Sequence, residues 1–210
     1  MLREYCAENL RGVPEAIGAG AQRIELCDDL SAGGVTPSEE VMRTAVAMTH
    51  KMDAKIMVMV RPRGGDFSYS DDEQHLMETA IGVARKSGAD GVVFGCVRQG
   101  HLDVAATRRL AYAAQGMDMT FHMAFDEIDE SLQSEALGLL GELGFSRVLT
   151  HGGPLSKPID ECLPHLHDLV QAAKSVITIM PGGGVTWENA GRICSYLHVD
   201  EVHGTRIVDW

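Results

Sequence analysis

Short apolar runs alternate with longer amphipathic segments along the whole chain. Eight runs rich in β-branched or other apolar residues have the length and pattern of buried strands. These strands are expected at Leu2–Glu8, Arg23–Asp28, Lys55–Arg61, Gly91–Val97, Met117–Phe125, Arg147–His151, Val176–Met180 and Asp200–Gly204. Helices are expected between them, from Pro37 onward and at Asp71–Ser87, Asp103–Gln115, Glu130–Leu143, Pro158–Ala173 (kinked at Pro164) and Trp187–Leu197. The first crossover, Asn9–Ala19, contains Gly12, Pro14 and Gly18 and gives the weakest helical signal.

Strands that alternate with helices predict parallel β-α units joined by right-handed crossovers. Eight such units most simply close into a (β/α)₈ TIM-type barrel, and an open doubly wound sheet is the alternative. The barrel is favoured because no Gly-x-Gly-x-x-Gly follows the first strand and polar residues follow nearly every strand. We expect one barrel domain over residues 1–210 that lacks its final helix, since the chain ends at Trp210.

Composition narrows the function classes. The chain has 210 residues and a formal net charge of −12, which argues against a nucleic-acid partner. No apolar run is long enough to span a membrane, and the first residues do not resemble a signal peptide. Five cysteines without a Cys-x-x-Cys pair indicate reduced thiols, so we expect a cytoplasmic protein. The missing helix would leave apolar surface for a second copy, which predicts a homo-oligomer.

Charged residues fall on the strand faces that should point into the barrel. Alternation along the strands places Glu25, Arg61, His122 and either Glu201 or His203 inward, and it puts Asp126 on the same face as His122. Buried charges need partners, and Glu25 and Arg61 could pair because they lie on neighbouring strands. Polar groups at the carboxyl end of a barrel usually serve a site. A polar network that only stabilises the fold is the alternative.

Two loops have the composition of anion-binding segments. Arg61 and Arg63 flank a Gly-Gly turn that ends at Asp66, so forked donors could hold a carboxylate or phosphate. The alternative is a tight turn whose arginines pair with Asp66. Gly182, Gly183 and Gly184 follow the seventh strand, where backbone N–H groups bind phosphate in many barrels, and the segment from His203 to Arg206 would be the partner loop.

Cys6 and Cys27 lie at similar heights on adjacent strands. Two inward thiols could bind a soft ion such as Cu(I), because thiolates select such metals. The alternative is that both are small buried hydrophobic residues, which is the commoner role of cytosolic cysteine.

Several motifs in order along the chain resemble the CutC family. They are Arg23-Ile24-Glu25-Leu26-Cys27, Gly33-Gly34-Val35-Thr36-Pro37-Ser38, Arg61-Pro62-Arg63-Gly64-Gly65-Asp66-Phe67, Thr120-Phe121-His122-Met123-Ala124-Phe125-Asp126, Arg147-Val148-Leu149-Thr150, Met180-Pro181-Gly182-Gly183-Gly184 and Val202-His203-Gly204-Thr205. The resemblance covers essentially the whole chain. It implies a cytoplasmic barrel with a role in copper homeostasis and copper bound at cysteines.

The resemblance also assigns residues. Cys6 and Cys27 match the family's strand cysteines, and its polar cluster is matched by Glu25, Arg61, Arg63, Asp66, His122 and Asp126. Position 123 is Met where many relatives have Arg. By strand alternation Met123 should face the helices, which removes one anion ligand but leaves the inward site intact.

Two functions therefore remain open. The first is a copper-homeostasis protein that binds Cu(I) at Cys6 and Cys27. The second is a barrel enzyme that acts on a small anionic metabolite. In the second, Arg63, Asp66, His203 and the Gly182–Gly184 loop would bind the ligand, and Glu25, Arg61, His122 and Asp126 would supply the catalytic groups.

Overall fold

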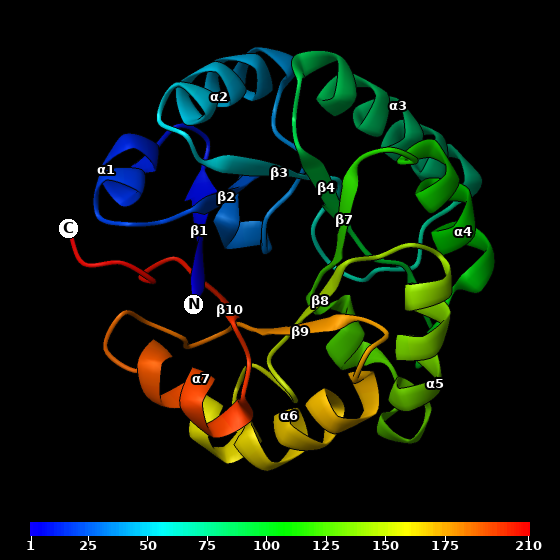
Figure 1. Cartoon of the computed structure of the whole chain (residues 1–210). Coiled ribbons are helices and arrows are strands. Elements are labelled where there is room, and N and C mark those ends of the chain that lie inside the picture. The colour runs from blue at the N-terminus through cyan, green and yellow to red at the C-terminus, as the bar shows by residue number, and fades with distance from the viewer.

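The computed structural model describes Met1–Trp210 as eight parallel strands in a nearly closed barrel with seven α-helices outside it (Figure 1). The strands are β1 (Leu2–Glu8), β2 (Arg23–Cys27), β3 (Lys55–Met59), β4 (Gly91–Phe94), β7 (Asp118–Phe121), β8 (Arg147–Thr150), β9 (Thr178–Pro181) and β10 (Glu201–Gly204). Their order around the barrel is β10-β1-β2-β3-β4-β7-β8-β9. The loops that follow β9 and β10 are joined by a parallel bridge between Thr186 and Arg206. The predicted TIM-type barrel is confirmed.

The helices lie where the sequence pattern predicts them. They are α1 (Val13–Gly18), α2 (Glu39–Lys51), α3 (Asp71–Ser87), α4 (Val104–Ala113), α5 (Glu130–Glu142), α6 (Ile159–Ala173) and α7 (Ala190–Leu197). The cleanest start is that of α3, where Ser70 and Glu73 form a reciprocal capping box. Gly88 ends the same helix with φ 87°, a conformation that suits glycine. None of the helices combines the length and the apolar character that a membrane span requires.

Most strands are shorter than predicted. The apolar run after Gly91 is split, because β4 ends at Phe94 and a small hairpin of β5 (Val97–Arg98) and β6 (His101–Leu102) follows. The run after Met117 is also split. β7 ends at Phe121, and a 3₁₀ turn, η2 (Met123–Glu127), begins with the His122 side chain accepting a hydrogen bond from the N–H of Ala124. Strand alternation therefore stops at Phe121.

No helix follows β10, as predicted. The last residues run between α7 and α1 on the outside of the barrel, where an eighth helix would lie (Figure 1). Ile207 and Val208 of this tail are buried, and the Trp210 ring packs edge-on against Tyr5 with centroids 6.2 Å apart. The tail thus covers part of the surface that the missing helix would leave bare. The predicted homo-oligomer stays a prediction.

A ladder of alternating charges crosses the interior of the barrel at its amino-terminal end. Arg23 donates hydrogen bonds to Glu4 and, at 2.5 Å, to Glu201. Arg147 donates to the same Glu201 carboxylate at 3.0 Å and to Asp118 at 2.7 Å. Because each buried guanidinium lies between two carboxylates, the interior contains charge without leaving either arginine unpaired.

Replacing Arg23 with methionine should remove the buried guanidinium that lies between the carboxylates of Glu4 and Glu201. Removing one partner of a buried ion pair costs about 3–5 kcal/mol, so the free energy of unfolding should fall by about that amount. Urea denaturation measures it. Arg43→Met is the matched control, because Arg43 pairs with Glu39 on the exposed face of α2 and should change stability by less than about 1 kcal/mol. Equal losses in the two variants would contradict the ladder's importance.

Candidate functional site

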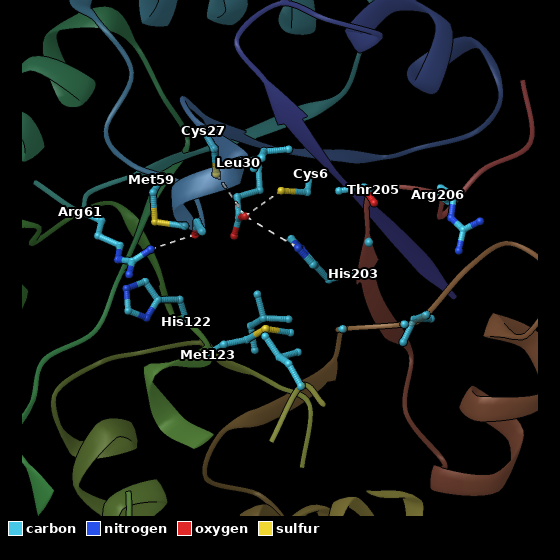
Figure 2. Close-up of a pocket in the computed structure, with 18 of the residues that line it drawn as sticks. Cys6, Cys27, Leu30, Met59, Arg61, His122, Met123, His203, Thr205 and Arg206 are labelled. Carbon is cyan, nitrogen blue, oxygen red and sulfur yellow. Dashed lines mark hydrogen bonds and ion pairs between the residues drawn. The ribbon is translucent and has the colours of Figure 1, made fainter. Parts of the chain in front are cut away.

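A pocket of about 360 Å³ opens at the carboxyl end of the barrel (Figure 2). One wall is formed by side chains of the first, second and last strands, and the other by the loops that follow β7, β8 and β9. Its apolar lining is formed by Leu30, Met59, Phe67, Met123, Leu149, Leu155 and Val185. Of its polar side chains, Glu25, Arg61, His122 and His203 are buried, whereas Thr205 and Arg206 are exposed.

Two thiols and a carboxyl group meet at the closed end of this pocket. Cys6 on β1 and Cys27 on β2 each lie 3.4 Å from the same oxygen, Oε1 of Glu25. The three ligand atoms all lie within 4.8 Å of one another. The register explains this, since Cys6 pairs with Glu25 and Glu8 with Cys27, so all three side chains point inward. Met57, Met59 and Val93 complete an apolar shell around the thiols.

His203 on β10 joins this group to the charge ladder below it. Its Nδ1 lies 2.9 Å from Glu4, and its Nε2 lies 3.8 Å from Oε1 of Glu25. Burial alone lowers the pKa of His203, but the acidic groups of Glu25, Cys6 and Glu4 raise it well above its ordinary value. His203 is thus a cation held between the ladder and the thiols.

The remaining acidic groups divide according to the cations within reach. Burial opposes ionisation of Glu4, yet Arg23 and His203 bring its pKa down to about 2. The neighbouring Cys27 thiol and His203 lower the pKa of Cys6 to about 5 against the effect of burial. Burial raises the pKa of Glu25 well above its usual range, and the pKa of Cys27 is raised by the Cys6 thiol and by burial. One thiolate, Cys6, therefore lies beside one thiol, Cys27, at neutral pH.

His122 lies across the pocket from the thiols (Figure 2). Its Nδ1 accepts a hydrogen bond from the N–H of Ala124 at 3.2 Å, and its ring stacks on Phe67 with centroids 4.9 Å apart. Burial, aided by the positive charge of Arg61, lowers the pKa of His122 to about 3. The ring is neutral, and because Nδ1 is an acceptor its proton lies on Nε2. That Nε2 has no partner in the protein, and neither does Oε2 of Glu25.

The predicted pair of Glu25 and Arg61 does not form. The Arg61 guanidinium instead donates to the backbone oxygens of Ala32, Gly33 and Gly34 at 3.0–3.2 Å, and to that of Gly65 at 2.7 Å. It also stacks over the Phe67 ring at 4.6 Å. Arg61 lines the pocket, but most of its N–H donors form hydrogen bonds that hold the loops after β2 and β3 together.

The predicted two-arginine anion clamp is also wrong. Arg63 does not line the pocket; it forms ion pairs with Asp66 at 3.1 Å and with Glu73 at 2.5 Å. Asp66 in turn accepts a hydrogen bond from the N–H of Ser68. The Gly-Gly segment is therefore the tight turn with local ion pairs that the sequence left as the alternative.

Two residues of the η2 turn take places that strand alternation does not predict. Asp126 lies outside the pocket lining and accepts hydrogen bonds from Thr150 Oγ1 and from the N–H groups of His151 and Gly152. Met123 lines the pocket instead of facing the helices, because β7 ends two residues before it. Position 123 thus faces the pocket.

The glycine loop after β9 forms part of the opposite wall. Gly183 and Gly184 line the pocket with φ 68° and 91°, both in the left-handed region, whereas Gly182 is not among the lining residues. Thr205 and Arg206 of the loop after β10 lie beside them. The sequence pattern predicts that these loops contribute to the site. It does not predict that Met59 and Leu149 line the pocket, because an apolar side chain in a strand gives no indication of a functional role.

Comparison with known proteins identifies the relatives of this chain. The sequence model of the CutC family matches residues 1–208. A family protein CutC from Enterococcus faecalis is 44% identical over 99% of this chain and all of its own length. A copper homeostasis protein cutC homolog from Homo sapiens is 40% identical over 96% of this chain and 72% of its own.

Solved structures agree with these matches. A crystal structure from Streptococcus agalactiae, whose description names CutC and copper homeostasis, superposes with a TM-score of 0.96 at 43% identity, covering 99% of this chain and all of that one. An aldolase designated QR15 superposes with a TM-score of 0.70 at 12% identity, covering 98% of this chain and 89% of that one, which shows a shared fold and nothing more.

His122 should make the protein less stable in mild acid. The unfolded state takes up a proton on this histidine below pH 6.5, whereas the folded state does so only near pH 3. The free energy of unfolding should therefore fall by up to about 1.4 kcal/mol per pH unit as the pH drops through this window. His122→Asn keeps an acceptor for the Ala124 N–H and should remove this contribution when stability is measured by denaturation between pH 6.5 and 4.

The control for this experiment is His101→Asn, which alters an exposed histidine on β6. Its stability should follow the wild-type pH dependence. A parallel pH dependence in His122→Asn and the wild type would contradict a neutral, buried His122.

Proposed function

The chain belongs to the CutC family, and we propose that it serves copper homeostasis by binding Cu(I) between the thiols of Cys6 and Cys27. The copper homeostasis names of its relatives support the general role. The observation that carries the proposal is the convergence of two sulfur atoms on one carboxyl oxygen, each at 3.4 Å, in a buried and mostly apolar corner.

The donor set fits a soft monovalent ion. Cu(I) prefers thiolate and thioether ligands. The two thiols here are surrounded by methionines, so most of the donor atoms in this corner are sulfur. The low pKa of Cys6, about 5, supplies one thiolate before the metal arrives. Loss of the proton from Cys27 on binding would complete a bis-thiolate pair, and the charge of the second thiolate would be balanced by the ion itself.

The carboxylate and imidazole groups nearby already have partners within the protein. Glu4 is paired with Arg23, and His203 is held by Glu4 through Nδ1 and carries a positive charge. A histidine ligand to zinc must be neutral. The arrangement therefore favours two-coordinate Cu(I) over a Zn(II) site built from both cysteines and His203.

The five free cysteines support a cytoplasmic location, because thiols persist in reducing compartments.

One observation favours a second function in the same pocket. A volume of about 360 Å³ is much larger than a metal ion needs, and two buried polar atoms beside it, Oε2 of Glu25 and Nε2 of His122, have no partner. We propose as the second candidate that the pocket binds a small anionic metabolite, with Glu25 as the acid–base group and the neutral His122 as a hydrogen-bond donor to the ligand.

Copper binding should depend on this pair of cysteines and not on the others. Titration of the reduced protein with Cu(I), against a competing chromophoric chelator, should give one tight site per chain. Cys6→Ser with Cys27→Ser should abolish that site, because a hydroxyl is a poor ligand for a soft ion. The matched control is Cys162→Ser with Cys194→Ser, which removes the same number of thiols elsewhere and should bind as the wild type does.

The variant His203→Ala distinguishes a Cu(I) site from a Zn(II) site. Loss of the imidazole should weaken Cu(I) binding by less than about tenfold, since the histidine affects the thiolate but does not ligate the ion. Unchanged Cu(I) affinity in the Cys6 and Cys27 variant would overturn the proposal. So would a site that prefers Zn(II) and disappears with His203.

A further inference from the structure

We propose that the mouth of the pocket is a phosphate site, formed by the N–H groups of the Gly183–Val185 loop together with Thr205 and Arg206, and that it holds the phosphate of a small phosphate monoester. This inference deepens the second candidate function and does not depend on copper. It concerns the loops that follow β9 and β10, whose residues line the pocket together with the thiols.

The loop after β9 presents donors that the protein does not use. The backbone N–H groups of Gly183, Gly184 and Val185 donate no hydrogen bond within the chain, although all three residues line the pocket. Successive N–H groups in a turn with left-handed residues form a concave nest that binds anions. Gly183 and Gly184 meet this condition with φ 68° and 91°.

Neighbouring contacts hold the loop in this conformation. The Asn189 side chain accepts a hydrogen bond from the N–H of Thr186 at 2.8 Å and donates one to the carbonyl oxygen of Gly184 at 2.9 Å. The Trp187 N–H donates to the carbonyl of Arg206 at 2.8 Å, which ties the two loops together. The Gly184 carbonyl thus has an internal partner, and the N–H groups of residues 183–185 are left for a ligand.

The loop after β10 adds a hydroxyl and a positive charge. Neither the N–H nor the hydroxyl of Thr205 has a partner in the protein, and the Arg206 guanidinium makes no ion pair or hydrogen bond. Arg61 and Arg63, by contrast, are occupied by backbone carbonyls and by carboxylates. An unpaired guanidinium beside an N–H nest is the combination that recognises phosphate.

The pocket behind this mouth calls for an organic group and not a free ion. Phosphate alone would leave most of the 360 Å³ empty and would not reach both unpartnered atoms, Oε2 of Glu25 and Nε2 of His122. Each of the two is at most 4% exposed and lines the same pocket. A hydroxyl on a short carbon chain would satisfy them, since His122 offers an N–H donor and Oε2 of Glu25 is a free acceptor.

Binding of inorganic phosphate and of glycerol 3-phosphate to the reduced, copper-free protein tests this site. In ¹H–¹⁵N spectra both compounds should shift the amide signals of Gly183, Gly184, Val185 and Thr205. Glycerol 3-phosphate should bind more tightly than inorganic phosphate, and His122→Asn should reduce that advantage. Arg206→Ala should weaken both by about tenfold, the value of one hydrogen bond to a charged group.

Two further variants locate the effect. In Gly184→Ala the new Cβ meets nothing closer than Ile159 at 3.6 Å, so the change alters the φ 91° conformation without crowding and should also weaken binding. Arg43→Ala removes an exposed arginine from α2 and should bind as the wild type does. Absence of shifts in the Gly183–Val185 amides, or equal affinity in Arg206→Ala and the wild type, would overturn the phosphate site.

The copper proposal and the phosphate proposal are tested independently of each other. The variant with Cys6→Ser and Cys27→Ser should keep wild-type phosphate binding, and Arg206→Ala should keep wild-type Cu(I) binding. Loss of phosphate binding in the cysteine variant would overturn the assignment of the two ligands to separate groups of residues in the pocket.

Discussion

The pairing of charge inside the barrel is the constraint on which the rest of the structure depends. Small barrels usually fill their interior with branched apolar side chains, but here Glu4, Arg23, Arg147 and Glu201 occupy it. Each arginine lies between two carboxylates, so the ladder is satisfied only as a whole. The short parallel strands around it must keep their register, because a slip of one residue would turn these charges toward the helices.

The ladder also determines the chemistry above it. Glu4 contacts both Arg23 and His203, so the histidine lies over the ladder with one nitrogen engaged and a positive charge. That charge lowers the pKa of Cys6, while burial raises the pKa values of Glu25 and Cys27. The pKa of the Cys6 thiol is therefore lowered partly by His203, a group that does not bind the proposed ion. In the proposed anion site, the N–H groups of the Gly183–Val185 loop lie with Arg206 among the lining residues of the pocket, apart from the soft donors of the thiol pair.

The sequence reveals the fold in detail and the site only in part. Strand alternation on β1 and β2 places Cys6, Glu25 and Cys27 inward, and the structure brings them together. Alternation fails at Phe121, because the His122 side chain caps a 3₁₀ turn there, and Met123 consequently faces the pocket. The partners of Arg61 were also beyond prediction, since it binds three consecutive carbonyls of a loop whose path the sequence does not specify. Long-range backbone contacts of this kind have no signature in residue type or spacing.

The central claim is that two sulfur atoms, and no other atoms of the protein, hold the copper ion. Copper K-edge X-ray absorption of the protein loaded with one equivalent of Cu(I) measures this directly. The account predicts a first shell of two sulfur neighbours without the multiple-scattering pattern of imidazole. A shell that contains histidine nitrogen, or one unchanged when Cys6 and Cys27 are replaced by serine, would contradict it.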